Sequence, residues 1–181
     1  MEPDTGWIRR LSLHAANAVL LLSSAVLAWR AWPGLPPQIP VHFNAEGDPD
    51  AWAPRDSNIL LLLVLVPWGL TLLLYGVARM TTLLAANPAF INIPRKQEFL
   101  ALPRERQMPL WRLMQETLAA VAVGVNVVFL ALLSGVFRVA LGAESALSPP
   151  ALFIPITLTV LLTVGYSVAS RRLVNRLIDG R

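Results

Sequence analysis

The chain of 181 residues contains no cysteine and few charged residues, and both absences limit what it can be. Without cysteine it can form no disulfide, no thiolate metal site, no cysteine nucleophile and no lipid-modified cysteine. Charged residues make up only 14% of the sequence, whereas hydrophobic residues make up 55%. This balance is too apolar for an ordinary soluble domain of this size. The composition therefore points to an integral membrane protein.

Four apolar runs of about 20 residues or more predict membrane-spanning helices, because a helix rising 1.5 Å per residue then crosses a hydrocarbon core of ~30 Å. The runs lie at 11–32, 58–78, 113–137 and 151–170. We expect an all-α fold: a single membrane domain over residues 1–181, built as a four-helix bundle. An ordered cap at 33–57 is expected between the first two spans, and a longer loop at 79–112. The first run has no small-residue cleavage site near its end, which indicates a retained helix.

The distribution of basic residues predicts the orientation of the chain. All but three of the 15 Lys and Arg residues lie in the N-terminal tail, in the 79–112 loop or in the C-terminal tail, the exceptions being Arg30, Arg55 and Arg138. The positive-inside rule then places both termini and that loop in the cytoplasm. The basic residues flank apolar runs and form no continuous stripe, so the expected partner is the lipid bilayer and not a nucleic acid.

The cap at 33–57 is predicted to be stiff, because it holds six of the 15 prolines. Apolar residues at 39, 41 and 43 alternate with other residues, which predicts a short extended piece. Turns are expected at 44–47 and again at 48–50. We expect the apolar side chains of this cap, Trp52 among them, to press on the ends of the helices.

One cluster in the cap could carry chemistry: an imidazole and three carboxylates within nine residues, namely His42, Glu46, Asp48 and Asp50. Such a set could bind a divalent cation or form a pH-sensitive patch. Its spacing matches no defined metal loop. A structural cap is the favoured interpretation, a ligand or partner site comes second, and catalysis comes last.

Polar residues inside the predicted spans are a second feature. His14 and Asn17 lie near the cytoplasmic end of the first span, and Glu116 lies at the same depth in the third. Hydrogen bonding between helices is a more common role for such residues than transport. Asn126, near the middle of the third span, is expected to bond another helix. The candidate partners are the fourth-span threonines Thr157, Thr159 and Thr163.

The 79–112 loop mixes basic and apolar residues, which suits short pieces lying on the inner leaflet. Prolines 94, 103 and 109 argue against one long amphipathic helix here. The functional alternative is a docking site for a cytoplasmic protein.

Two blocks of the sequence resemble a known family. The first is Leu35-Pro-x-x-Ile-Pro-x-His42-Phe43-Asn44-x-x-Gly47-Asp48-Pro-Asp50-x-Trp52, which is similar to the signature of the SdpI-type bacterial membrane family and its uncharacterised relatives. The second block, in the 79–112 loop, comprises Asn92, Pro94, Lys96, Phe99, Leu102, Pro103, Glu105 and Arg106. The better-known members are longer and have six spans.

This resemblance implies a protein of the bacterial cytoplasmic (inner) membrane. It also implies functions of the kind linked to those members, namely immunity to a secreted toxic peptide and membrane sequestration of a transcriptional repressor. Ligand or partner binding is then expected at the motif residues His42, Phe43, Asn44, Gly47, Asp48, Asp50 and Trp52. Docking of a cytoplasmic protein at the 79–112 loop, called here the inner loop, would involve Asn92, Pro94, Lys96 and Arg106.

No nucleophile with its base, phosphate loop or cofactor fingerprint is found, so we expect no cofactor and no catalytic residues. The hypothesis that follows is a non-enzymatic protein whose outer loop recognises an extracytoplasmic ligand, peptide or partner. One alternative is an accessory subunit of a larger membrane complex or transporter. The other is a small metal-dependent membrane enzyme or carrier.

Overall fold

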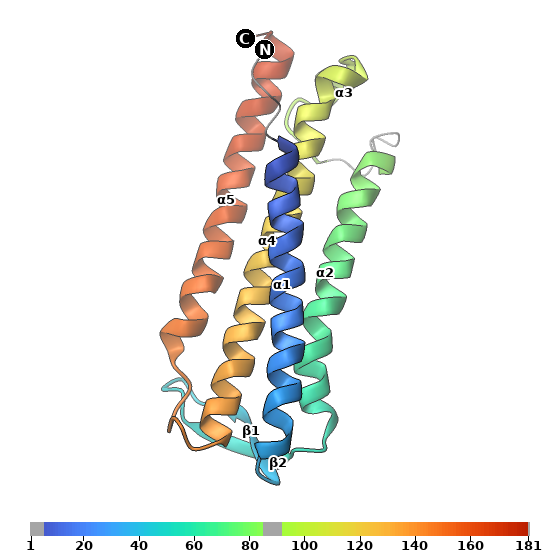
Figure 1. The fold of residues 1–181 in the computed structure, drawn as a ribbon. Helices are drawn as coiled ribbons and strands as arrows, with labels where there is room; N and C mark the ends of the chain where they lie inside the picture. Colours follow the sequence, from blue (N-terminus) through green and yellow to red (C-terminus); the bar gives the residue numbers. More distant parts are fainter. Residues whose placement is uncertain (1–5, 85–91, 181) are drawn as a thin grey trace.

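A computed structural model of the protein describes residues 6–84 and 92–180. In chain order the elements are α1 (Gly6–Ala31), a 3₁₀ turn (Trp32–Gly34), β1 (Gln38–Phe43), β2 (Pro49–Pro54), α2 (Asn58–Leu84), α3 (Lys96–Ala101), α4 (Arg104–Ala140) and α5 (Pro149–Asp179). Figure 1 shows the described ends of the chain and α3 at one end of the molecule, called here the terminal end. The β1–β2 hairpin closes the opposite end, called the hairpin end.

Four helices, α1, α2, α4 and α5, are long and apolar enough to cross a membrane. This confirms the predicted all-α fold with four spans, to which the structure adds a small two-stranded sheet in the predicted cap. The protein is thus a multi-pass membrane protein. An even number of spans explains why both described ends of the chain lie at the terminal end (Figure 1).

The helices extend beyond the predicted spans at the terminal end. The span predicted from residue 113 belongs to α4, which begins at Arg104 and continues through Pro109. Likewise α2 continues to Leu84, and α5 continues to Asp179. Hydropathy marks where a chain enters lipid, whereas helical hydrogen bonds continue into water, so the helices are longer than the spans predicted from hydropathy. Residues 85–91 of the predicted loop lie outside the described residues.

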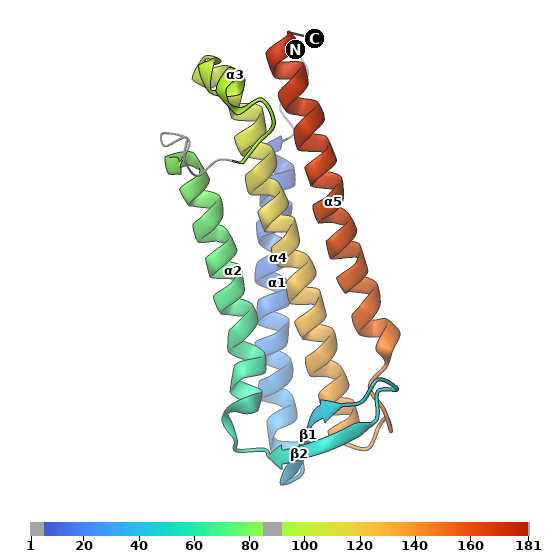
Figure 2. The same ribbon diagram turned by 180° about the vertical axis from the view of Figure 1, so that it is seen from behind.

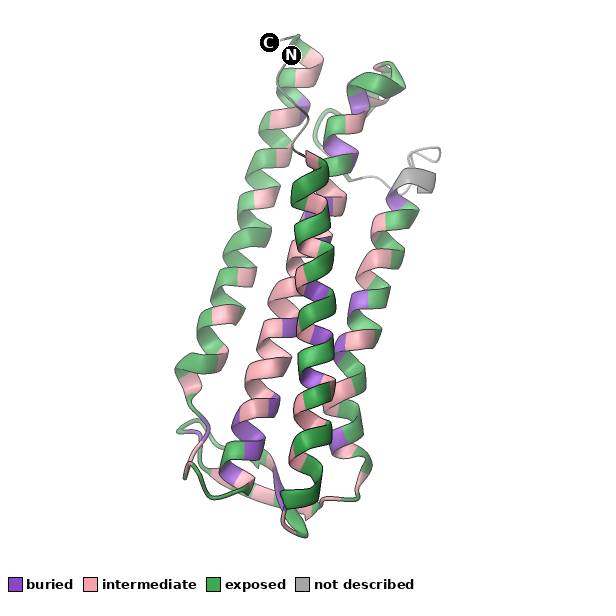
Figure 3. Ribbon diagram, in the orientation of Figure 1, coloured by how far each residue is buried: buried purple, intermediate pink, exposed green. Residues whose placement is uncertain are grey.

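The long helix α4 is the centre of the molecule. The helices α1, α2 and α5 each pack along it, while α1 and α2 also touch one another. Within the described chain, α5 makes no comparable contact with α1 or α2, and Figure 2 shows α2 and α5 on opposite sides of α4. Figure 3 shows α5 exposed along most of its length, and Val174 is its one buried residue. The bundle therefore leaves its side open between α2 and α5.

Two apolar clusters close the ends of this bundle. The hairpin-end cluster consists of Leu35, Ile39, Leu60, Leu133, Val136 and Phe137. The terminal-end cluster consists of Phe99, Leu110, Trp111 and Val174. Phe99 of α3 is fully buried, and its ring meets that of Trp111 edge-on with centroids 5.9 Å apart. Burial of large side chains fixes both the hairpin and α3 to the helix ends.

Candidate functional site

The predicted cap is an antiparallel β-hairpin. Ile39 pairs with Ala53 and Pro40 with Trp52, and the register then slips between Pro40 and Phe43. The extended piece predicted at 39–43 is confirmed as part of β1. The second turn predicted at 48–50 is wrong, because residues 49 and 50 belong to β2. Their strand conformation follows from pairing with β1, which local turn propensity does not report.

Asn44 and Gly47 shape the turn of the hairpin. The Asn44 side-chain oxygen accepts hydrogen bonds from the backbone N–H groups of Glu46 (3.1 Å) and Asp48 (2.8 Å). Gly47 has a φ of +95°, and a Cβ there would collide with the carbonyl oxygen of Leu147. In turn the N–H of Leu147 donates to the Gly47 carbonyl at 2.7 Å. Both residues therefore have structural roles, and Gly47 joins the hairpin to the loop before α5.

The inner face of the hairpin is fixed to the helices. Ile39 is fully buried in the hairpin-end cluster, and Phe43 packs against that cluster while half-buried. Arg55 donates to the carbonyl of Leu35 at 2.7 Å, and its guanidinium lies 5.7 Å from the centre of the Trp32 ring. These contacts hold the hairpin in one orientation on α1 and α4.

The outer face of the hairpin presents Trp52, His42 and Asp50. Along β2 the residues alternate between half-buried and exposed, and Trp52 is 50% exposed. The expectation that Trp52 presses on the helix ends is therefore wrong, because strand alternation turns it outward while Ala51 and Ala53 face inward. His42 Nδ1 lies 2.6 Å from a carboxylate oxygen of Asp50. An exposed indole thus shares this face with a hydrogen-bonded imidazole–carboxylate pair.

The structure does not gather the four side chains His42, Glu46, Asp48 and Asp50 into one group. Within residues 6–84 and 92–180, no group of three or more His, Asp or Glu side chains is placed to hold a metal ion. His42 meets Asp50, while Glu46 and Asp48 contribute backbone groups to the turn and keep exposed side chains. Proximity in sequence did not bring the four side chains together, because the turn points them in different directions.

A polar network lies inside the membrane-spanning part. It consists of His14 and Asn17 of α1, Thr71 and Tyr75 of α2, and Asn126 of α4. Asn126 donates its amide to Asn17 at 2.8 Å and to the Thr71 hydroxyl at 3.1 Å. Asn17 donates to the Tyr75 hydroxyl and to the Ala119 carbonyl of α4, each at 3.0 Å. His14 Nδ1 lies 2.9 Å from the same Tyr75 hydroxyl.

The polar network corrects the prediction of which residues bond Asn126. Asn126 does bond other helices, but its partners lie on α1 and α2 and not among the α5 threonines. Thr159 and Thr163 instead donate to carbonyls of their own helix. Thr71 and Tyr75 were missed, although polar residues four apart in an apolar run mark one face of a helix. Asn17 and Asn126 are each 1% exposed, so their amides have no access to water.

Glu116 lies at the terminal end of this network. It is 7% exposed and forms ion pairs with Arg9 and, at 3.6 Å, with Arg10. Together with His14 and Tyr75 it lines a cavity of about 220 Å³. A buried carboxylate requires such partners, so the pair of arginines explains how α1 and α4 tolerate it.

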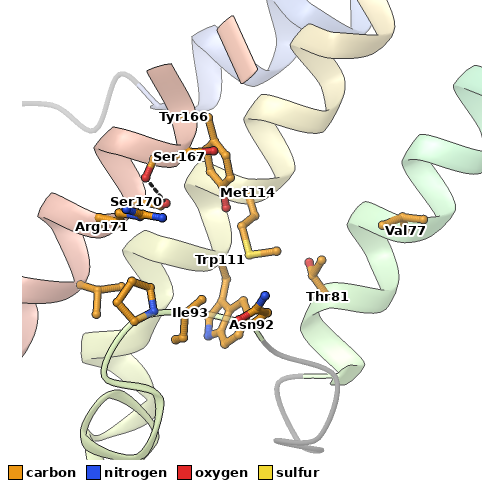
Figure 4. Close-up of a pocket in the computed structure, with 12 residues that line it drawn as sticks. Val77, Thr81, Asn92, Ile93, Trp111, Met114, Tyr166, Ser167, Ser170 and Arg171 are labelled. Carbon is orange, nitrogen blue, oxygen red and sulfur yellow. Dashed lines mark hydrogen bonds between the residues drawn. The ribbon is translucent and has the colours of Figure 1, made fainter. Parts of the chain in front are cut away.

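A larger cavity of about 600 Å³ opens between α2 and α5 at the terminal end. Figure 4 shows Tyr166, Ser167, Ser170 and Arg171 of α5 facing Val77 and Thr81 of α2, with Trp111 and Met114 of α4 between them. Asn92 and Pro94, predicted for partner docking, line it on the side of α3. Tyr166 and Arg171 could not be identified from the sequence as cavity residues, since nothing in their spacing marks a cavity.

The other inner-loop candidates lie away from this cavity. Lys96 begins α3, and Arg106 is exposed on α4. Arg95, just before α3, has a φ of 51° and forms ion pairs with Glu98 (2.6 Å) and with Asp179 of α5 (2.8 Å). Its hydrogen bonds lower the pKa of the Glu98 carboxyl. This arginine ties α3 to the end of α5.

Comparison with known protein families identifies one region. Residues 18–66 match the model of DUF1648, described as a domain of unknown function. The DUF1648 match includes most of α1, the whole hairpin and the first part of α2. No curated protein and no solved structure matches the chain. The matched unit thus centres on the hairpin and on the parts of α1 and α2 that flank it in the chain.

Proposed function

We propose that the protein is a non-enzymatic membrane protein whose hairpin binds a secreted peptide or the exposed part of another protein. The observation that carries this proposal is the half-exposed Trp52 on a hairpin whose opposite face is locked to the helices. A rigidly held indole offers a large contact area at little entropic cost, and tryptophan is enriched among the residues that dominate binding energy. The adjacent His42–Asp50 pair supplies polar groups that would orient the partner.

The proposed membrane is the inner membrane of a bacterium, with both termini in the cytoplasm and the hairpin outside. The concentration of basic residues at the terminal end supports this orientation through the positive-inside rule. The resemblance of the hairpin sequence to the SdpI-type family supports the bacterial assignment. In an immunity-like or signalling-like role, the hairpin would act as the receptor and the inner loop with α3 would face a cytoplasmic partner.

Binding of the protein in lipid nanodiscs to the peptide fraction of the source organism's growth medium tests this proposal. We expect a peptide that is retained saturably by the unaltered protein and lost with Trp52→Ala. The matched control is Trp29→Ala, because Trp29 of α1 is 75% exposed but lies outside the hairpin. Retention that falls equally with both variants, or no retained peptide, would argue against a peptide receptor.

A protein partner is tested by native mass spectrometry of the protein extracted gently from its own membrane. A second chain present in a fixed ratio and lost with Trp52→Ala supports recognition through the hairpin. A second chain that survives both this substitution and His42→Ala would instead indicate an accessory subunit attached through its helices.

A further inference from the structure

The open side of the bundle carries two cavities that the proposed function does not use, together called the groove here. Its terminal-end part is the cavity of about 600 Å³, a volume typical of ligand pockets. A second cavity of about 280 Å³ lies deeper in the membrane-spanning part, between the same three helices α2, α4 and α5. Leu70 lines the deeper cavity and Val77 the other, so the two are ~10 Å apart along α2 at 1.5 Å per residue.

The two parts of the groove differ in chemistry. The deeper part is lined by Leu70, Val125, Val128, Phe129, Ile156, Thr159 and Val160. The hydroxyl of Thr159, its only polar side-chain group, already donates to the Pro155 carbonyl at 2.7 Å. The terminal-end part has a polar rim that includes Asn92, Ser170 and Arg171. An occupant of the whole groove must therefore be apolar along most of its length and polar at one end.

The charge at the rim selects the polar end of the occupant. Arg171 is exposed and lines the cavity, and within the described chain no carboxylate lies at ion-pair distance from it. Arg95, by contrast, is neutralised by Glu98 and Asp179. A guanidinium without an acidic partner at the membrane interface favours an anionic phosphate group, to which it can donate two parallel hydrogen bonds.

We propose that the groove between α2 and α5 binds one anionic phospholipid of the leaflet at the terminal end. Its headgroup lies at Arg171, and an acyl chain runs between α2 and α5 toward Thr159. From Arg171 to Val160 the rise along α5 is ~16 Å, about half of the ~30 Å hydrocarbon core and so the depth of one leaflet. The bound lipid fills the space that α2 and α5 leave over α4. This site lies at the opposite end from the hairpin and is independent of the proposed function.

Native mass spectrometry tests the lipid site, using the protein released from nanodiscs of equal parts phosphatidylglycerol and phosphatidylethanolamine. We expect one retained phosphatidylglycerol per chain, in preference to phosphatidylethanolamine. Arg171→Gln should lower this preference about fivefold, the ratio expected for one basic residue near anionic lipid. The matched control is Arg172→Gln, because Arg172 is also exposed but does not line the cavity.

A second pair of variants tests the acyl-chain path. Val160 and Val164 are both exposed on α5, but only Val160 lines the deeper cavity. Val160→Trp should abolish retention of either lipid, whereas Val164→Trp should leave it unchanged. Equal retention of the two lipids by the unaltered protein, or equal loss with Arg171→Gln and Arg172→Gln, would overturn the proposal. A dimer that dissociates with Val160→Trp would also overturn it, since a second copy would then occupy the groove.

Discussion

Helices α1, α2 and α4 are held together in a different way from α5. The polar network joins the first three through buried amide and hydroxyl groups. Within the described residues, α5 makes no side-chain hydrogen bond to another helix in the membrane-spanning part. Four of its hydroxyl groups instead bond the backbone of α5 itself, those of Thr159, Thr163, Ser167 and Ser170. It is attached by close packing at Gly124, by the Gly47–Leu147 hydrogen bond at one end and by Arg95 at the other.

The two kinds of attachment suit two different roles, which are the rigid support of the hairpin and the formation of a lipid site. Hydrogen bonds between helices fix which faces meet, because an unpaired amide in hydrocarbon is costly. Packing on α4 alone leaves the face of α5 toward α2 uncovered, and the groove between α2, α4 and α5 opens there. The three-helix unit therefore carries the hairpin rigidly, while α5 provides one wall of a site for lipid.

Loss of the contact between Gly47 and Leu147 should have the largest effect on stability. In Gly47→Ala the new Cβ meets the Leu147 carbonyl at a positive φ, so the turn must leave the loop before α5. We expect about 3 kcal/mol of destabilisation, from left-handed strain and the lost hydrogen bond. The measurement is the free energy of unfolding in mild detergent.

Gly142→Ala is the control for this change, because Gly142 also has a positive φ (+72°) but its Cβ would meet nothing within 4 Å. The loss of stability in Gly142→Ala should therefore come from backbone strain alone. Equal losses for the two variants would show that the contact with Leu147 contributes nothing.

A substitution in the polar network should have the second-largest effect on stability. Asn126→Leu keeps a similar volume but leaves the Asn17 oxygen without its donor, and we expect a loss of about 2 kcal/mol in the free energy of unfolding. Thr163→Val on α5 serves as the control, since its hydroxyl bonds only its own helix. Equal effects of these substitutions would remove the distinction between the two regions.

The packing of α5 on α4 can be tested by measuring the distance between α2 and α5. A Cβ on Gly124 would collide with the side chain of Thr159, so Gly124→Leu should push α5 away at a cost of about 1–2 kcal/mol. The chain has no cysteine, so spin labels at Leu73→Cys and Val168→Cys report the distance from α2 to α5 without background. We expect this distance to increase.

Two controls accompany the distance measurement. Labels at Val19→Cys and Leu73→Cys, on α1 and α2, should report no change with Gly124→Leu. Gly165→Leu should leave the distance from α2 to α5 unchanged, because a Cβ there meets nothing within 4 Å. An increase with Gly165→Leu would show that bulk on α5, and not the contact with Thr159, moves the helix.

The ion pairs of Arg95 should have the smallest effect, because they are exposed to solvent. The pKa of Glu98 is lowered, so its stabilising contribution is complete above the ordinary carboxylate pKa and is lost as the pH falls through the lowered value. Arg95→Gln should lower the unfolding midpoint slightly at neutral pH, and this effect should shrink progressively as the pH falls below the ordinary carboxylate pKa. Arg176→Gln, on the exposed surface of α5, should leave the unfolding midpoint unchanged at every pH. A loss with Arg95→Gln that does not depend on pH would contradict a stabilising ion pair.

Features that depend on local sequence were predictable. Long apolar runs determine the four spans, and the alternation at 39–43 determines the first strand. Asn126 was correctly expected to bond another helix, because a buried amide must find a partner. Its partners were not predictable, since the few polar residues of a span mark one of its faces but do not reveal which helix that face meets.

The sequence by itself determined the membrane class of the protein, its four crossings, the common end of its termini and the stiff segment between the first two helices. Only the tertiary structure decided that α4 is central, that Trp52 points outward, that four ionisable residues of the cap do not converge, and that α2 and α5 enclose a groove. The physical reason is that hydropathy and turn chemistry act within a few residues. The meeting of helix faces depends instead on close packing and hydrogen bonds between residues far apart in the chain, such as Asn17 and Asn126.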